Sequence, residues 1–260
     1  MLICRGDSVQ RITLKVGSSV LTQNNAIAKE RMLNLVSLIS KLKKEYEVVL
    51  VSSGAVAAGY TALRLDRKKR ISKKVLAAVG QPILMSGYKQ LFDIYDIDIS
   101  QILTTEEDFD SITHIDIFKQ IINAQLENSI LPIVNENDIT TTSEQLFGDN
   151  DQLAAHVAHH TNSNILVILS DIDGYYDSNP TDFSDAKIIP HMSVIPKKAL
   201  MQKHTPNNEF ATGGIVTKLK AAEYLLKKER KMFLCSGFNL ITAEDFLLNG
   251  HQDKGTLFSA

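Results

Sequence analysis

Lysine, serine and glycine residues follow short apolar runs at several places in the sequence. Lys15 lies in the run "ITLKVGSS", Ser53 follows "VVLVS", and Lys218 follows the glycine pair of "ATGGIVTK". Ammonium groups, hydroxyl groups and glycine-rich turns that lead into a helix are the groups that hold phosphate anions in proteins. These residues therefore predict a polyphosphate site.

Two clusters of acidic and amide residues accompany these cations. The stretch "VNENDI" contains Asp138, and the stretch "GDND" contains Asn150 and Asp151. The first follows an apolar strand pattern, and the second leads into a helical pattern. Carboxylate and amide groups beside a phosphate site can position a magnesium ion and a polar co-substrate.

The elements that carry these residues follow from the apolar pattern. Strands are expected at residues 11–16, 47–52, 97–103, 130–134, 164–170 and 231–235, and near the terminal "GTLF". Helices are expected at 28–44, after Gly54, at 72–92, 113–128, from about Asp149, at 217–228 and at 243–248. Pro82 predicts a kink or a break in its helix. Residues 171–212 are expected to be largely irregular.

Branched apolar runs that alternate with helices predict a mainly parallel sheet covered on both faces. The expected fold is a three-layer α/β/α sandwich, with residues 1–260 in one domain. Ligands of such sheets bind beyond the carboxyl ends of the strands. Each polar residue alone could serve only as a turn, a cap or an exposed edge residue. Together they predict a site, because they all fall at the same end of the sheet.

Composition restricts the class of protein further. The 260 residues carry a net charge of −2, which does not favour nucleic acid or an anionic membrane as a partner. Two cysteines, Cys4 and Cys235, suggest reduced thiols, and no apolar run is long enough to span a bilayer. We therefore expect a cytoplasmic protein with no membrane partner.

Two other patterns in the sequence could indicate a different kind of site. The basic run "RLDRKKRISKK" (residues 64–74) is expected to be a solvated loop and helix start, although it could lie near the nucleotide phosphates. His156 and His160 have a spacing that can hold zinc, but a partly exposed helix face is the simpler interpretation. The sequence contains neither a P-loop nor the G-x-G-x-x-G of a dinucleotide fold.

The motifs "KVGSS", "SSGAVAAG", "LAAVGQ", "VNEND", "GDND", "SDIDGYY", "ATGGIVTK" and "GTLF" together resemble the amino-acid kinase superfamily and, within it, the glutamate 5-kinases. The resemblance runs from about residue 11 to residue 258. It implies the amino-acid kinase fold, ATP as co-substrate with Mg²⁺, and a homo-oligomer. It also implies feedback inhibition by proline. The chain ends soon after "GTLF", so the resemblance is to a form without the C-terminal PUA domain.

The resemblance also implies roles for individual residues. Lys15 and Lys218 match the lysines that contact the transferred phosphoryl group, and Asp151 matches the aspartate that orients them. The glutamate-binding positions match Ser53, Asp138 and Asn150. The nucleotide-binding positions match Lys15, Ser170, Asp171, Thr212, Gly213, Gly214, Ile215, Val216, Thr217 and Lys218. Ser170 stands where threonine is common, and Ile215 stands where methionine is common.

The expected reaction is phosphorylation of the side-chain carboxylate of L-glutamate, which gives L-glutamyl 5-phosphate for proline biosynthesis. That carboxylate has a reference pKa of about 4.3, so it is already a nucleophile at neutral pH and needs no general base. Asp138 is expected to pair with the ammonium group, and Asn150 or backbone N–H groups with the α-carboxylate. Two alternatives stay open: an N-acetylglutamate kinase or similar enzyme, and a non-catalytic nucleotide sensor.

Overall fold

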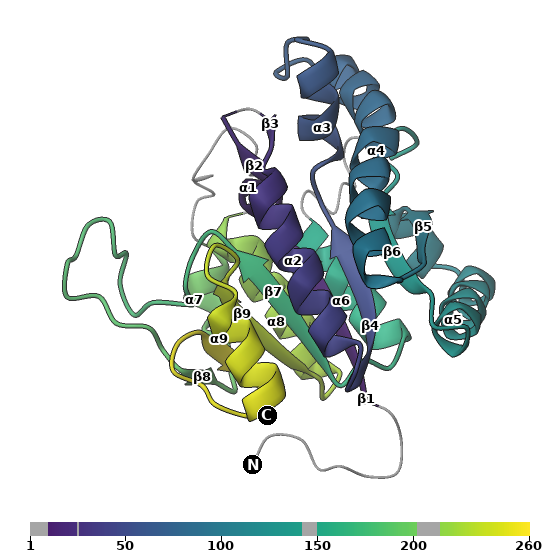
Figure 1. The fold of residues 1–260 in the computed structure, drawn as a ribbon. Helices are drawn as coiled ribbons and strands as arrows, with labels where there is room; N and C mark the ends of the chain where they lie inside the picture. The colour runs from purple at the N-terminus through teal and green to yellow at the C-terminus, as the bar shows by residue number, and fades with distance from the viewer. Residues whose placement is uncertain (1–9, 25, 142–149, 202–213) are drawn as a thin grey trace.

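A single eight-stranded sheet runs through the protein (Figure 1). The computed structural model describes residues 10–24, 26–141, 150–201 and 214–260. The strand order is β5-β6-β4-β1-β7-β9-β10-β8. The strands are β1 Gln10–Val16, β4 Tyr46–Ser52, β5 Ile99–Thr104, β6 Leu131–Glu136, β7 Ile165–Ser170, β8 His191–Met192, β9 Lys231–Ser236 and β10 Thr256–Phe258. The first six strands in this order are parallel, whereas β10 is antiparallel to β9.

Helices lie on both faces of this sheet (Figure 1). They are α1 Ser18–Leu21, α2 Lys29–Leu42, α3 Ala55–Ala62, α4 Arg70–Phe92, α5 Ile112–Glu127, α6 Asn150–His160, α7 Lys197–Leu200, α8 Ile215–Lys227 and α9 Ile241–Glu244. Shorter elements are η1 Asp93–Tyr95, η2 Glu106–Phe109, η3 Asp245–Asn249 and the hairpin of β2 Thr22–Gln23 with β3 Ala26–Ile27. The predicted mainly parallel sheet with helices on both faces is confirmed.

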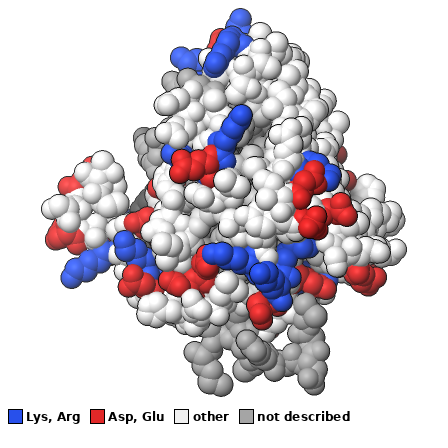
Figure 2. Space-filling view, viewed as in Figure 1, with Lys and Arg blue, Asp and Glu red and all other residues white. Residues whose placement is uncertain are grey.

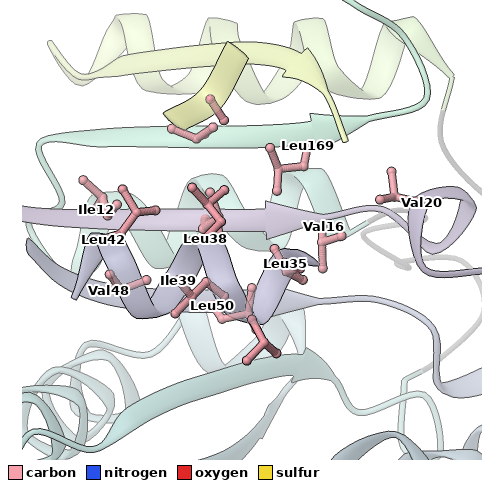
Figure 3. Close-up of a cluster of buried hydrophobic side chains, with 14 of the residues drawn as sticks. Ile12, Val16, Val20, Leu35, Leu38, Ile39, Leu42, Val48, Leu50 and Leu169 are labelled. Carbon is pink, nitrogen blue, oxygen red and sulfur yellow. The ribbon is translucent and has the colours of Figure 1, made fainter. Parts of the chain in front are cut away.

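The strand sequences divide their side chains between two cores. In β4, Val48 and Leu50 pack in the core that α2 and α4 cover, whereas Val49 and Val51 pack in the core that α5, α6 and α8 cover. Successive strand residues point to opposite faces, so a run of apolar residues fits a strand that is buried on both sides. Figure 3 shows the first core, with leucine and isoleucine side chains of α2 against residues of β1 and β4.

Two predicted elements differ from the structure in ways that matter for the site. Strand β6 continues beyond the apolar run to Glu136, so the buried Asn135 belongs to the strand and not to the loop after it. Helix α4 is not broken at Pro82. Its buried residues Leu76, Gly80 and Leu84 flank the proline on the face that packs inward, and this packing outweighs the lost backbone hydrogen bond.

Basic side chains gather at the tip of the α3–α4 hairpin, whereas charges of both signs mix over the rest of the visible face (Figure 2). The exposed members are Arg64, Lys68, Lys69, Arg70 and Lys73. Within the described residues, no helix combines the length and the apolar character that a membrane span requires.

Candidate active site

Two lysines and one aspartate form a buried cluster at the carboxyl end of the central strand. The Lys15 Nζ atom lies 2.5 Å from Asp151 Oδ1. The Lys218 Nζ atom lies 3.1 Å from Asp151 Oδ2. Lys15 is 2 % exposed, Asp151 is 0 % exposed and Lys218 is 5 % exposed. Charged groups are buried in this way only when they are paired, so Asp151 holds both ammonium groups in fixed positions.

The sequence dictates how these three side chains meet. In β1, Ile12, Leu14 and Val16 face the core under α2, so Lys15 points to the opposite face, where α6 and α8 lie. Asp151 lies in the first turn of α6, where the helix dipole favours a negative charge. Lys218 lies near the start of α8. The two helix starts therefore meet over the end of β1.

Hydrogen bonds between α6 and α8 support the cluster. The Thr217 hydroxyl lies 3.0 Å from Asp151 Oδ2 and 2.9 Å from the Gly214 carbonyl oxygen, and it can donate its one hydrogen to either. The Gln152 side chain donates to the Thr217 carbonyl oxygen at 3.1 Å. The starts of the two helices are thus held at a fixed separation.

A second group of polar residues lies next to the lysine cluster, since Asn150 precedes Asp151 in α6. The Asn150 Nδ2 atom is 2.8 Å from Asn135 Oδ1, 2.9 Å from Ser53 Oγ and 3.1 Å from the Ser52 carbonyl oxygen. Asn150 and Ser53, which were predicted together, therefore meet. The amide hydrogens predicted for a substrate carboxylate are already used within the protein.

The direction of these hydrogen bonds decides which polar atoms these residues can offer a ligand. The Ser52 carbonyl can only accept, so the Asn150 nitrogen faces the protein. The Ser53 oxygen accepts from Asn150, which leaves its hydroxyl hydrogen available to a carboxylate. Within the described part of the chain, no hydrogen bond engages Asn150 Oδ1, so this oxygen can accept from an ammonium group. The Ser53 hydroxyl and the Asn150 oxygen together could therefore bind the carboxylate and the ammonium group of an amino acid.

Asp138 lies in a turn directly after β6. The Asn137 carbonyl accepts the Thr141 hydroxyl at 2.8 Å and closes this turn. Lys74 of α4 donates to the Ile139 and Thr141 carbonyls at 2.7 and 2.8 Å. Burial raises the pKa of Asp138 to about 6, although the positive charges of Lys74 and Lys73 oppose the shift. Among the described residues no ion pair engages this carboxylate, so a ligand ammonium group could supply a cation.

Besides Lys15 of β1, the described members of the predicted nucleotide set lie at the end of β7, which pairs with β1, and at the start of α8. The Ser170 hydroxyl at the end of β7 donates to Asp171 Oδ1 at 3.1 Å. Gly214 is the N-cap residue of α8, so the free N–H groups of that helix are available to an anion. Val216 is buried, so only its backbone could contact a nucleotide. The predicted Thr212 and Gly213 lie outside the described residues.

The structure brings two predicted groups together and adds residues that the sequence did not single out. Lys15, Asp151 and Lys218 form one group, and Ser53 and Asn150 form the other. Among the residues that the structure describes, no hydrogen bond or ion pair joins Asp138 to either group. The added residues are Asn135 and Gln81, which bond to each other at 2.9 Å. The motif "LAAVGQ" was the only sequence signal for Gln81.

The zinc alternative finds no support among the described residues, where no group of three or more His, Cys, Asp or Glu side chains could hold a metal ion. The His156 ring stacks on Tyr224 and the His160 ring on Phe109. Burial, assisted by the charge of His159, lowers the pKa of both His156 and His160 to about 4. Both rings are thus neutral packing groups at pH 7.

Known proteins are similar to this chain in sequence. A model of the amino acid kinase family matches residues 10–236. Glutamate 5-kinase of Wolinella succinogenes is 49 % identical over 255 residues, which are 96 % of this chain and 98 % of that protein. Glutamate 5-kinase of Helicobacter hepaticus is 47 % identical over 95 % of this chain and 94 % of that protein.

Solved structures agree on the fold. An isopentenyl phosphate kinase aligns with a TM-score of 0.66 at 18 % identity, over 96 % of this chain and all of that chain. The carbamate kinase from Giardia lamblia bound to AMP-PNP aligns with a TM-score of 0.66 at 17 % identity, over 98 % of this chain and 99 % of that chain. These likenesses confirm the predicted amino-acid kinase fold.

Proposed function

The chain belongs to the amino acid kinase family and, within it, to the glutamate 5-kinases, and on this premise we propose that it transfers the γ-phosphoryl group of ATP to the side-chain carboxylate of free L-glutamate. The product is L-glutamyl 5-phosphate, an acyl phosphate. The observation that carries the proposal is the adjacency of two groups in α6. Asp151 holds Lys15 and Lys218, and the preceding residue, Asn150, bonds to Ser53, with which it offers groups suited to an amino acid.

The chemistry requires cations more than it requires a base. The side-chain carboxylate of glutamate is ionised at neutral pH, so its oxygen can attack the γ-phosphorus directly. The bond from phosphorus to the oxygen of ADP breaks, and ADP leaves with the electron pair. The barrier lies in bringing an anion to a polyanion. In this proposal, Lys15 and Lys218 lower it by neutralising the charge on the transferred group, and Asp151 keeps both lysines in position.

Mg²⁺ is proposed to arrive with the nucleotide. It prefers one or two protein carboxylates together with substrate phosphates, and when bound it neutralises phosphate charge. Asp171, at the end of β7, is the described carboxylate that lies among the predicted nucleotide residues. It is the residue we propose to contact the ion.

Free glutamate is favoured over N-acetylglutamate by the polarity of the pocket. The acetylated nitrogen is an uncharged amide, which would leave the carboxylate of Asp138 without a cation. A non-catalytic sensor is disfavoured because nucleotide binding alone does not require two buried lysines on one aspartate. The proposed substrate is therefore the amino acid with a free ammonium group.

Turnover of ATP with a panel of acids tests this function. Hydroxylamine in the assay converts an acyl phosphate to a hydroxamate, which is measured directly. We expect hydroxamate with L-glutamate and little with N-acetylglutamate, glutarate or L-aspartate. Hydroxamate from N-acetylglutamate alone would reverse the substrate assignment, and phosphate release without hydroxamate would contradict acyl phosphate formation.

Asp138→Asn is expected to raise the KM for glutamate at least tenfold at pH 7 and to change kcat little. The reason is the loss of a charge-assisted contact with the ammonium group. The same substitution should raise the free energy of unfolding. A carboxyl group whose folded pKa is raised stabilises the fold only at low pH, and that contribution is lost as pH rises from about 4 through about 6. The measurements are steady-state kinetics and urea unfolding.

The pH dependence provides the control for this prediction. In the unsubstituted protein, the KM for glutamate should rise as pH falls below about 6, because Asp138 becomes protonated. The glutamate side chain itself stays ionised down to about pH 5. The Asp138→Asn protein should lose this rise. An unchanged KM together with an altered KM for ATP would remove Asp138 from the glutamate site.

A further inference from the structure

We propose that Gln81 and Asn135 are positioning residues that fix the direction of the Asn150 amide, and thereby make the pocket prefer an amino acid over the same dicarboxylic acid without its ammonium group. This inference rests on the proposed function and extends it to residues outside the predicted site. Neither side chain is assigned to contact the substrate. Both act through Asn150.

A continuous chain of side-chain hydrogen bonds connects α4 to α6. The Asn135 Nδ2 atom donates to Gln81 Oε1 at 2.9 Å. Asn135 Oδ1 accepts from Asn150 Nδ2 at 2.8 Å and from the Glu136 backbone N–H at 2.9 Å. Gln81, Asn135 and Asn150 are all buried. Water therefore competes little for these groups, and each amide orientation carries a large free-energy difference.

Backbone groups at the ends of this chain determine its direction. The Glu136 N–H can only donate, so the Asn135 oxygen must point toward it. The Asn135 nitrogen must then point toward Gln81, which accepts. The Ser52 carbonyl can only accept, so the Asn150 nitrogen must point inward. The carbonyl oxygen of Asn150 is consequently the atom left for a ligand, and it recognises an ammonium group.

Close packing of α3 against α4 keeps Gln81 in place. An added Cβ atom at Gly80 would lie 1.8 Å from the Ala55 carbonyl oxygen, and one at Gly59 would lie 1.9 Å from the Leu76 carbonyl oxygen. The backbones of α3 and α4 are therefore in direct contact at Gly59 and at Gly80. The N-cap residue of α3 is Gly54, which directly follows Ser53 and has a φ of 111° that favours glycine. Gln81 is thus fixed relative to the end of β4.

Tyr88 of α4 holds the segment of Ser52 and Ser53 at the end of β4. Its hydroxyl lies 2.8 Å from the Ser52 hydroxyl, and both residues are fully buried. The Ser52 hydroxyl in turn donates to the Ser53 carbonyl oxygen at 3.0 Å. The partners of Asn150 are therefore held from α4 at two points, since Gln81 holds Asn135 and Tyr88 holds Ser52.

Loss of the Gln81 acceptor would weaken the preference of Asn135 and Asn150 for one amide orientation. Gln81→Met keeps the length and the burial of the side chain but leaves a buried Asn135 N–H group without its acceptor. The cost of this unpaired group opposes the arrangement that the Glu136 N–H and the Ser52 carbonyl favour. A turned arrangement then becomes populated, in which Asn135 presents its nitrogen to the Asn150 nitrogen. Asn150 would turn in response and present N–H groups to the ligand ammonium. Binding of the ammonium group weakens, whereas binding of a ligand that lacks this group changes little.

The test compares kcat/KM for L-glutamate with kcat/KM for glutarate. Gln81→Met is expected to lower this ratio roughly tenfold or more, mainly through the KM for glutamate, with the KM for ATP unchanged. Leu84→Met is the matched control. It also changes a buried α4 side chain, lies outside the hydrogen-bond chain, and should leave the ratio unchanged.

Two substitutions at Asn135 keep the proposal testable if Gln81→Met folds poorly. Asn135→Asp retains the oxygen that accepts from Asn150, so the ratio should stay within about twofold, whereas Asn135→Leu should lower it like Gln81→Met. In the double variant, Gln81→Met should add nothing to Asn135→Leu. An unchanged ratio in folded Gln81→Met or in Asn135→Leu would overturn the inference. An unsubstituted protein that does not phosphorylate glutamate would overturn the proposed function instead.

Discussion

Replacing Lys218 with methionine is expected to lower kcat by roughly 10³-fold with a much smaller change in the KM for glutamate. Cationic groups aimed at a transferred phosphoryl group contribute about 10²- to 10⁵-fold to such reactions. Methionine keeps the length and the apolar stem of lysine, so the packing of α8 is retained. Lys15→Met should have a similar effect, because Asp151 holds both ammonium groups. Hydroxamate formation at saturating ATP and glutamate measures the change.

Stability has to be measured beside activity in these variants. Removing one partner of a buried ion pair costs about 3–5 kcal/mol, so the free energy of unfolding should fall while the protein stays folded at 25 °C. Lys220→Met is the matched control, since Lys220 lies two residues further along α8 and is exposed. It should change neither property. Near-normal turnover in both Lys15→Met and Lys218→Met would contradict the proposed mechanism.

Asp151→Asn is expected to lower both the stability and kcat, the latter at least 10²-fold. Without this carboxylate, the ammonium groups of Lys15 and Lys218 repel each other in a buried setting. The cost of about 3–5 kcal/mol corresponds to a Tm lower by roughly 6–20 °C for a chain of this size. A non-hydrolysable ATP analogue should raise the Tm of this variant more than that of the unsubstituted protein, because phosphate supplies the missing negative charge.

Thermal melts with and without the analogue make this measurement. Glu223→Gln serves as the control, because Glu223 pairs with Lys227 on the exposed side of α8 at 3.1 Å and such pairs contribute little. Equal Tm values for Asp151→Asn and the unsubstituted protein would show that Asp151 does not hold the lysines. If the analogue raised the Tm of Asp151→Asn less than that of the unsubstituted protein, the lysines would not be the groups that bind the phosphates.

The strands and helices that pack on two cores could be predicted because burial leaves a pattern in the sequence. The run "EVVLVS" is apolar at successive positions because β4 has a core on each face. The direction of β10 could not be predicted in the same way, since a strand of three residues has a similar pattern in either orientation. The short β8 and α7 lie in the polar stretch after β7, where no periodic pattern marks them.

The part of the site that could be predicted is the part formed by residues at strand ends and helix starts. Lys15, Asp151 and Lys218 were predicted as one group, and they are in contact, although their roles remain predictions. The bond between Gln81 and Asn135 joins residues 54 positions apart, and it depends on side-chain orientation within a buried strand end. Sequence pattern carries no information on the direction of an amide, so the direction of the Asn150 amide emerges only from the hydrogen-bond geometry.

The transfer of labelled oxygen tests the central claim most directly. Glutamate with ¹⁸O in its side-chain carboxylate is turned over with ATP and trapped with hydroxylamine, which attacks the carbonyl carbon and releases phosphate with the bridging oxygen. If the carboxylate attacks the γ-phosphorus, each phosphate released with a hydroxamate carries one ¹⁸O atom, and Lys218→Met abolishes its formation. Phosphate without ¹⁸O would mean that water, and not the glutamate carboxylate, accepts the phosphoryl group.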